Sequence, residues 1–501
     1  MEIQENNMKS ISDVRNPVSR PVRVLQFGEG NFLRAFADWM IDITNEKTNF
    51  NGNAVLIQPL DRGLADMING QNGLYTTVLR GVQDGKTVEE LRVINSVSGA
   101  LNPYRDREAY LSCAENPDLR FIISNTTEAG IAYEASDKFD DRVQSSFPGK
   151  VTAFLHRRFT HFGGDPAKAL VFIPCELIDK NGDKLREIVL RYAEEWNLDG
   201  AFIAWVAQSC DFCNSLVDRI VPGYPKEEAE EICAKAGYED KLLDAAEIFH
   251  LWVIETKNDY SREFPLAGAG LNVIWTQDMS FYRTRKVRIL NGAHTLTVPA
   301  AFLAGVDTVE ECIKDPLLLS FMKKGIFEEI IPSMDGDALE LKGYAADVLE
   351  RFANPYIRHM LLSITLNTVS KFKTRDLPSL LSYMAKNKKV PPALAFSLSA
   401  LIAFYEGTRL HDGQLDGTRN SVTYPVKDDQ AVLEKFAALY QMDGNNKEKA
   451  ARAARAVLME KEWWGEDLTL HAGLEDAVRS GLESIWTKGM KAALQAVCSS
   501  R

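Results

Sequence analysis

The sequence has few cysteines, no long apolar run and no excess of positive charge. Its 7 cysteines are an odd number spread over 501 residues, which does not fit a disulfide framework. The longest mostly apolar run, residues 393–405, is too short to span a bilayer. Residues 1–20 are polar and contain no apolar core of a secretory signal. These absences favour a cytoplasmic protein without disulfides and without a membrane partner.

The charge balance argues against a nucleic-acid partner. There are 58 Lys and Arg against 70 Asp and Glu, a net charge of -12. A protein that neutralises the phosphates of a nucleic acid is usually basic. An anionic small molecule is still compatible, because a few local cations can outweigh the overall sign. The 45% hydrophobic and 26% charged residues are typical of a soluble globular chain, here long enough for several domains.

The chain divides into two parts with different patterns of secondary-structure signals. Short β-type runs alternate with helical stretches such as 183–195 in the first part; the runs are 22–27, 54–58, 120–123, 169–173 and 201–206. This alternation predicts a mostly parallel sheet covered on both faces. The later part has helical periodicity, with helices expected at 316–331, 360–370, 393–406 and 447–461 and a polar loop at 406–424. Asp315 before Pro316 is an expected helix cap.

We therefore predict an α/β Rossmann-type N-terminal domain followed by an all-α C-terminal domain. The expected boundaries are a polar arm at 1–20, the dinucleotide-binding domain at 21–278 and the helical domain at 279–501, which would carry substrate and catalytic residues.

A glycine-rich turn lies between the first expected strand and the helix over 31–45. Gly28 permits a tight turn, and Gly30 would let the backbone approach a pyrophosphate at the helix N-terminus. The third glycine of the usual pattern is replaced by Leu33. Such a turn alone is a weak signal, because small residues are common between any strand and helix. Its place at the start of an α/β array favours dinucleotide binding.

The end of the second strand leaves the choice of dinucleotide open. An acid there normally accepts hydrogen bonds from the adenosine ribose hydroxyls. This strand ends in Gln58, with Asp61 and Arg62 following. Asp61 favours NAD, whereas Arg62 suits the 2′-phosphate of NADP, and both are equally compatible with ordinary loop charges.

A Lys–Asn–His cluster follows at the start of the helical part. Asn291 and His294 share a helix face, whereas Lys286 would lie about 80° away on an unbroken helix. We therefore expect a helix that starts near Asn291, with Lys286 on the segment before it. A lysine whose pKa is lowered by burial or by neighbouring arginines can exchange a proton with a secondary alcohol. An asparagine can stabilise the alkoxide, and a histidine can hold the hydroxyl.

These segments together resemble the polyol-specific long-chain dehydrogenases, the mannitol dehydrogenase family. The resemblance covers nearly the whole chain and is carried by Phe27-Gly-Glu-Gly-Asn-Phe-Leu-Arg-Ala35 and by Lys286-x4-Asn291-x2-His294. It implies an NAD-dependent, metal-independent oxidoreductase with Lys286 as general acid/base, and with Asn291, His294 and Asn214 as its partners. The implied cofactor-binding residues are Gln26, Phe27, Gly28, Glu29, Gly30, Asn31, Phe32, Leu33, Arg34, Ala35 and Asp61.

The resemblance also bears on the substrate. Lys371 matches a substrate-contacting lysine, but Ser363 stands where mannitol-specific members carry an arginine. This departure favours a sugar acid over a plain polyol, because a carboxylate suits a group of cations. The candidate substrate-binding residues are Lys371, Arg375, Arg358 and Lys257. The alternatives are a different keto-hexuronate, a plain polyol, and a protein that senses the dinucleotide or sugar acid without catalysis.

The remaining motifs are interpreted as structural. Cys210 and Cys213 have the spacing of half a zinc site, but no second pair follows, so we expect no metal. Glu128 and Glu176 each follow a β-type run and could act as general acids, although helix caps or cofactor-side loops are the preferred interpretation.

Overall fold

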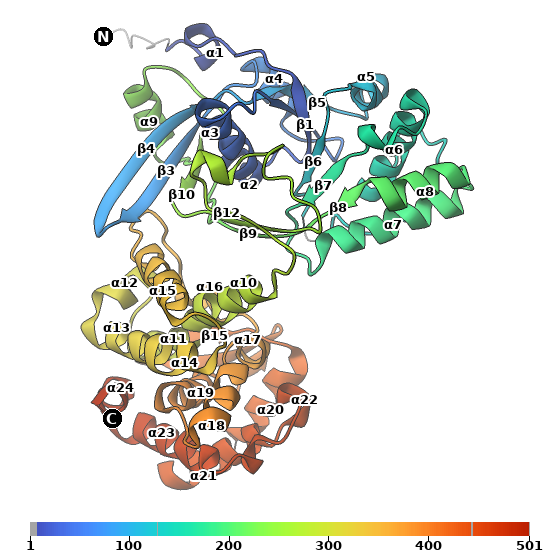
Figure 1. The fold of residues 1–501 in the computed structure, drawn as a ribbon. Helices are drawn as coiled ribbons and strands as arrows, with labels where there is room; N and C mark the ends of the chain where they lie inside the picture. The colour runs from blue at the N-terminus through green and yellow to red at the C-terminus, as the bar shows by residue number, and fades with distance from the viewer. Residues whose placement is uncertain (1–7, 128, 442–443, 500–501) are drawn as a thin grey trace, which may run out of the picture. The chain divides into compact units, whose positions relative to one another are not determined.

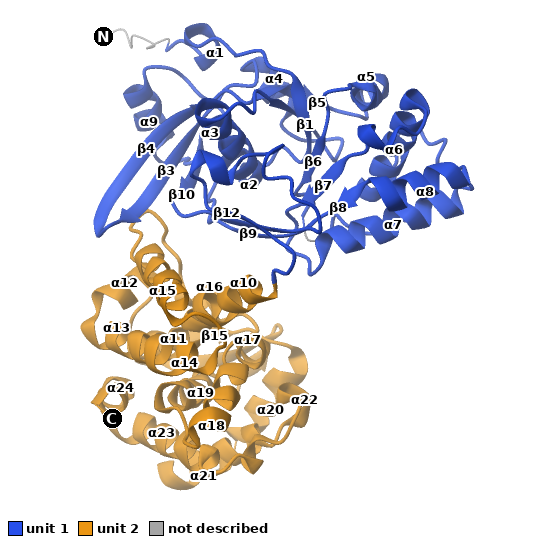
Figure 2. Ribbon diagram, viewed as in Figure 1, with its two compact units in different colours: residues 1–279 blue, residues 280–501 orange. Residues whose placement is uncertain are grey.

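The computed structural model describes residues 8–127, 129–441 and 444–499, and the chain divides into two compact units, Met1–Met279 and Ser280–Arg501 (Figures 1 and 2). Within the described residues, no helix has the length and apolar character needed to cross a bilayer.

A six-stranded parallel sheet forms the centre of the first unit. Its strand order is β5-β2-β1-β6-β7-β8, and every neighbouring pair is parallel. The strands are β1 (Val22–Phe27), β2 (Asn53–Ile57), β5 (Val97–Leu101), β6 (Phe121–Ser124), β7 (Val171–Pro174) and β8 (Asp211–Phe212). The chain runs outward from β1 to β2 and β5 and then returns to the other side of β1. The strand order therefore reverses between β1 and β6, where α/β sheets bind ligands.

Both faces of this sheet are covered. Val24 of β1 belongs to one apolar cluster together with Met40, whereas the next residue, Leu25, belongs to another together with Phe154. The helices of this unit are α1 (Ile11–Val14), α2 (Asn31–Leu33), α3 (Trp39–Lys47), α4 (Ala65–Gly70), α5 (Arg107–Ser112), α6 (Phe147–Phe162), α7 (Asn181–Glu195), α8 (Gly200–Ser209) and α9 (Ala229–Ala236). The predicted Rossmann-type α/β class is confirmed.

Two smaller sheets complete this unit. One contains β10 (Asp244–Glu247), β3 (Tyr75–Gln83) and β4 (Lys86–Ile94), and the other contains β12 (Val273–Thr276), β11 (Leu251–Glu255) and β9 (Asn214–Asp218). Figure 1 shows the long β3–β4 hairpin in blue.

Two local predictions for the first unit were wrong. Residues 201–206 form part of α8 and not a strand. Asp199 caps this helix by accepting the N–H of Ala201, and the buried Phe202, Trp205 and Val206 have helical spacing. The expected loose arm is also partly ordered, because α1 buries Ile11 against Leu74 and Tyr238. Residues 1–7 of that arm lie outside the described residues.

The second unit is built around buried helices. Its helices are α10 (Ser280–Arg285), α11 (Gly292–Leu303), α12 (Val309–Lys314), α13 (Pro316–Lys323), α14 (Ile331–Ser333), α15 (Ala338–Phe352), α16 (Leu361–Ile364), α17 (Thr368–Arg375), α18 (Leu377–Asn387), α19 (Pro392–Phe404), α20 (Gln430–Leu439), α21 (Asn446–Leu458), α22 (Lys461–Trp464), α23 (Leu474–Lys488) and α24 (Met490–Ser499). Every residue from Ala393 to Phe404 is buried, and α19 packs against α11 and α23. Asp315 caps α13 as predicted.

Three details of the second unit differ from the predictions made from its sequence. The expected loop at 406–424 contains a small antiparallel sheet of β13 (Leu410–His411), β14 (Gln414–Arg419) and β15 (Val422–Val426). The expected helix 360–370 is interrupted because Asn367 takes a left-handed conformation with φ 55°. The helix that carries Lys286 begins at Ser280 and not near Asn291.

Candidate functional site

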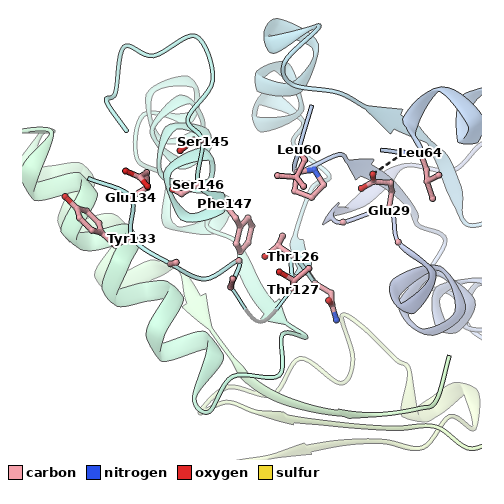
Figure 3. Close-up of a pocket in the computed structure, with 17 residues that line it drawn as sticks. Glu29, Leu60, Leu64, Thr126, Thr127, Tyr133, Glu134, Ser145, Ser146 and Phe147 are labelled. Atoms are coloured by element: carbon pink, nitrogen blue, oxygen red, sulfur yellow. Dashed lines mark hydrogen bonds between the residues drawn. The ribbon is translucent and has the colours of Figure 1, made fainter. Parts of the chain in front are cut away.

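A cavity of about 560 Å³ lies inside the first unit, at the carboxyl ends of β1 and β6. Its walls come from the turn after β1, the segment after β2, the loop after β6 and the start of α6. In Figure 3, Glu29, Leu60 and Leu64 form one side, Tyr133 and Glu134 form the other, and Thr126 and Phe147 lie between them. The cavity therefore occupies the place where the strand order reverses.

The glycine turn has the geometry that a dinucleotide requires. Gly28 has a φ of 111°, and a Cβ at this residue would lie 2.6 Å from the backbone oxygen of Asn125. Gly30 precedes the first helical residue, Asn31, and a Cβ there would meet no atom within 4 Å. The first glycine is thus needed for the fold of the turn. The second leaves open space above a helix N-terminus, which fits a pyrophosphate.

Replacing Gly28 with alanine should lower the free energy of unfolding by about 2 kcal/mol or more, because the side chain is strained at this φ and collides with backbone. Urea unfolding followed by tryptophan fluorescence measures this change. Gly30→Ala is the matched control, since its side chain has room and its stability should stay within about 0.5 kcal/mol of wild type. Equal stabilities for both variants would contradict this account of the turn.

The other residues expected at the cofactor fall into two groups. Glu29 lines the cavity beside Gly28 and Gly30. The remaining members do not line the cavity; they are Gln26, Phe27, Asn31, Phe32, Leu33, Arg34 and Ala35. Arg34, for example, is buried and donates to the backbone oxygen of Glu29 and to Asn31 Oδ1.

A network of buried polar side chains contacts the backbone of the glycine turn. Gln26 donates to the Gly28 backbone oxygen at 3.1 Å and to Asp38 Oδ2 at 3.3 Å, and the Tyr75 hydroxyl donates to the same carboxylate oxygen at 3.0 Å. Burial raises the pKa of Asp38 to about 7, against the smaller lowering effects of Tyr75 and Gln26. Burial also raises the pKa of Asp244, which faces Arg34, to about 7.

These shifts predict that the first unit loses stability as pH rises from about 4 to about 7. The folded Asp38 keeps its proton over this range, whereas the unfolded chain releases it, so folding is favoured most at the acidic end. Asp38→Asn has no ionisable group at this position. It should therefore remove a pH-dependent loss in the free energy of unfolding on the order of 4 kcal/mol. Urea unfolding at several pH values measures it, with the exposed Asp84→Asn as control. Parallel pH profiles for wild type and Asp38→Asn would contradict the prediction.

The end of β2 does not present a carboxylate to the cavity. Gln58 donates to the backbone oxygens of Leu60 and Asp61 at 2.8 and 2.9 Å and accepts the N–H of Ala65. Its amide therefore shapes the loop. Asp61 and Arg62 are both exposed and are absent from the cavity walls.

Glu176 fixes the part of the wall that lies between the two sides of the cavity, the loop after β6. Its carboxylate accepts hydrogen bonds from the Ser124 hydroxyl and from both the N–H and hydroxyl of Thr126. It therefore shapes the loop after β6, as the structural interpretation expected. Glu128, in the same loop, lies outside the described residues.

The Lys–Asn–His cluster lies in the second unit on one continuous helical stretch. A π-helical turn, Lys286–Asn291, joins α10 to α11, and the Gly292 N–H bonds to the Val287 oxygen five residues earlier. In such a turn, residues i and i+5 lie on the same face, so Lys286 and Asn291 align. His294 follows one helical turn after Asn291. The offset expected on an ordinary helix is thus removed by the wider turn.

Aromatic rings fix His294. Its ring stacks on Phe352 at 4.2 Å between centroids and meets the edge of His359 at 5.4 Å. Within the described part of the chain, His294 Nε2 is buried without a hydrogen-bond partner. Burial lowers the pKa of His294 well below its ordinary value, and neighbouring basic side chains lower it further; these are His359, Arg375, Arg351 and Lys371. His294 is therefore neutral at pH 7.

Two of the predicted substrate cations belong to this cluster. Lys371 and Arg375 are half-buried on α17, and both act on the charge state of His294. Lys371 Nζ donates to the Ile364 backbone oxygen at 2.8 Å, and Arg375 donates to the Thr295 hydroxyl at 3.3 Å. Burial lowers the pKa of both groups. Each cation is thus held near the histidine.

The other two predicted cations are placed differently. Arg358 is exposed, and it adds a minor contribution to the lowered pKa of Glu311, which comes first from the hydrogen bond donated by the Asp307 backbone N–H. Lys257 is exposed in the first unit, just after β11. Ser363 is also exposed, and its hydroxyl donates to the Met360 backbone oxygen.

The arginines around Lys286 are engaged with other helices. Arg285 pairs with Glu340 at 2.7 Å and lies over the Tyr344 ring, and Arg288 donates to the Ser379 hydroxyl at 2.8 Å. The basic groups that lower the pKa of His294 therefore come from residues 351–375 and not from the arginines beside Lys286.

Asn214 lies in the first unit and is committed to local structure. Its Nδ2 donates to Asp183 at 3.2 Å and to Glu255 at 2.9 Å, and its Oδ1 accepts the Asp183 N–H. It therefore fixes the start of α7 against β11, and both of its amide hydrogens are in use.

Several residues that pack on α11 could not be identified from the sequence. Phe352 and His359 surround His294 but come from 58 or more positions later in the sequence, where no local pattern connects them. Asp376 is completely buried, and a Cβ on Gly292 would lie 2.8 Å from its Oδ1. Burial raises the Asp376 pKa well above its ordinary value, opposed by Arg375 and Arg288. In the sequence, the one signal that could have indicated Asp376 is that it directly follows Arg375.

Comparisons with known proteins agree with this architecture. Residues 22–268 match the mannitol dehydrogenase Rossmann domain, and residues 278–486 match the mannitol dehydrogenase C-terminal domain. An altronate oxidoreductase of Escherichia coli O7:K1 is 47% identical over 479 residues, covering 95% of this chain and 97% of that protein. An altronate oxidoreductase of Shigella flexneri is 46% identical over the same shares.

Two solved structures share the fold. A D-sorbitol dehydrogenase in substrate-free form has a TM-score of 0.77 at 23% identity and covers 95% of each chain. Mannitol 2-dehydrogenase from Pseudomonas fluorescens, in a ternary complex with NAD and D-mannitol, has a TM-score of 0.64 at 20% identity, covering 99% of this chain and 98% of that one. The sheet order, the helical second unit and the matches over both units agree: the chain belongs to the mannitol dehydrogenase family and is an oxidoreductase.

Proposed function

We propose that this chain is an NAD-dependent oxidoreductase that interconverts D-tagaturonate and D-altronate in hexuronate breakdown in the cytoplasm. The observation that carries the proposal is the alignment of Lys286, Asn291 and His294 on one face, beside the half-buried cations Lys371 and Arg375. The altronate oxidoreductases that match this chain support the choice of substrate.

The first unit supplies the cofactor site. Gly28 and Gly30 fit a pyrophosphate. The cavity extends from them to the segment after β2 on one side and to the loop after β6 on the other. When bound there, NAD supplies the hydride acceptor, and NADH the hydride donor.

In the direction of reduction, Lys286 gives a proton to the substrate oxygen as the carbonyl becomes an alcohol, and in the reverse direction it takes that proton back. Asn291 donates a hydrogen bond to the same oxygen while it carries negative charge. His294 is neutral and has a buried ring nitrogen with no hydrogen-bond partner among the described residues, so it can bind and orient a substrate hydroxyl.

The cations favour a sugar acid. Lys371 and Arg375 bring two positive charges to the histidine within a partly buried setting, where a carboxylate gains more from them than in bulk water. An uncharged polyol gains nothing comparable from the same groups. Between the two, Lys371 is our preferred carboxylate ligand.

Steady-state oxidation of NADH, followed by its near-UV absorbance, tests the proposed reaction. Tagaturonate, fructuronate and fructose are compared in parallel, and the series is repeated with NADPH. Rapid turnover of tagaturonate with NADH is the expected result. A preference for fructose would overturn the carboxylate argument, and a preference for fructuronate would assign a different keto-hexuronate. No turnover with any substrate would favour a non-catalytic sensor.

A further inference from the structure

Glu29 occupies an unusual position in the cavity wall. It lies between the two glycines of the turn, is 7% exposed, and lines the cavity. Its Oε1 accepts the backbone N–H of Leu64 at 3.1 Å, so a carboxylate from the turn after β1 reaches the segment that follows β2. Figure 3 shows this hydrogen bond beside Leu60, which also lines the cavity.

The end of β2, which usually carries an acid that accepts hydrogen bonds from the adenosine ribose hydroxyls, cannot do so in this chain. Gln58 directly follows β2, and both hydrogens of its amide are donated to loop carbonyls while its oxygen accepts a backbone N–H. Asp61 is exposed and does not line the cavity. Among the residues that line the cavity on the β1–β2 side, Glu29 is the one with a carboxylate.

The loop after β2 is shaped to receive this carboxylate. A Cβ on Gly63 would lie 2.0 Å from Glu29 Oε1 and 2.7 Å from the Gln58 side chain. Any side chain at position 63 would therefore displace Glu29 from its place. The glycine has no left-handed φ that would otherwise require it, so its role is to leave room for these two side chains.

We propose that Glu29 replaces the usual acid of the second strand: its carboxylate accepts hydrogen bonds from the adenosine ribose hydroxyls and thereby selects NAD over NADP. This inference rests on the proposed use of a nicotinamide dinucleotide. An ionised carboxylate only accepts hydrogen bonds, which suits two hydroxyl donors. A 2′-phosphate at the same point would bring like charge against a buried carboxylate, which is strongly unfavourable.

The test is an equilibrium titration of the purified protein with NADH and NADPH, followed by nucleotide fluorescence. Glu29→Gln keeps an oxygen that can accept the Leu64 N–H but removes the charge. It should weaken NADH binding about tenfold, which corresponds to about 1.4 kcal/mol, and should reduce the preference for NADH over NADPH by at least that factor. Gly63→Ala keeps Glu29 but displaces its side chain, so it should also weaken NADH binding.

The controls separate this inference from the cofactor assignment. Asp66→Asn, on the exposed side of α4, should bind both nucleotides as wild type does, and thermal melting checks that each variant is folded. A wild type that prefers NADH beside a Glu29→Gln variant with unchanged affinities would overturn the role of Glu29 alone. Loss of selectivity in Asp61→Asn but not in Glu29→Gln would do the same. A wild type that prefers NADPH would overturn the cofactor assignment itself.

Discussion

Lys286→Ala should reduce kcat by about 10³-fold while leaving the affinity for NADH unchanged. The lysine lies in the second unit, where the π-helical turn aligns it with Asn291 and His294, whereas the dinucleotide turn lies in the first unit. The substitution removes the group that exchanges the proton without altering Gly28, Gly30 or their cavity. The steady-state rate of NADH oxidation at saturating tagaturonate, followed by absorbance, measures kcat, and a fluorescence titration measures NADH binding.

The matched control is Lys323→Ala, which removes an exposed lysine on α13. It should retain wild-type kcat, so a loss specific to Lys286 reports on its position and not on total charge. A Lys286→Ala enzyme with kcat within about twofold of wild type would contradict the assignment of the general acid/base.

The second large effect concerns substrate binding. Lys371→Met keeps the length of the side chain but removes its charge, and it should raise KM for tagaturonate by about 10- to 100-fold with a smaller change in kcat. The reason is the loss of a charge-assisted hydrogen bond to the substrate carboxylate from a lysine that burial already holds near His294. Initial rates over a range of tagaturonate concentrations measure the change.

Two comparisons sharpen this test. Lys373→Met removes a lysine from the same short helix, α17, and should leave KM near the wild-type value. KM for fructose, which has no carboxylate, should change little in Lys371→Met. An unchanged KM for tagaturonate in that variant would show that Lys371 is not the carboxylate ligand and would leave Arg375 as the candidate.

The sequence predicted the sheet and the glycine turn well because local signals determine them. β1 and β2 are apolar runs bounded by glycine, asparagine or proline, and the helix after β1 carries apolar residues at regular spacing. The run 201–206 was misread because a short apolar stretch suits a buried strand or a buried helix equally. Asp199, the capping residue just before it, was the signal that distinguishes them.

Candidate site residues could be named from the sequence, whereas their geometry could not be predicted from it. The period of an ordinary helix cannot anticipate a π-helical turn, so Lys286 was placed on a separate segment although it shares a helical face with Asn291. Phe352 and His359 approach His294 only through the packing of distant helices. In the same way, nothing in the sequence around Glu29 shows that its carboxylate meets Leu64, because that contact spans 35 positions.

The central claim is that this chain transfers hydride between NADH and the keto carbon of tagaturonate. The most direct test uses NADH carrying deuterium at the transferable position of its nicotinamide ring, with tagaturonate as substrate and mass spectrometry of the product. The expected product is D-altronate that carries one deuterium on the newly formed carbinol carbon, and Lys286→Ala should give no labelled product at early times. Unlabelled product, or a labelled product other than altronate, would contradict it.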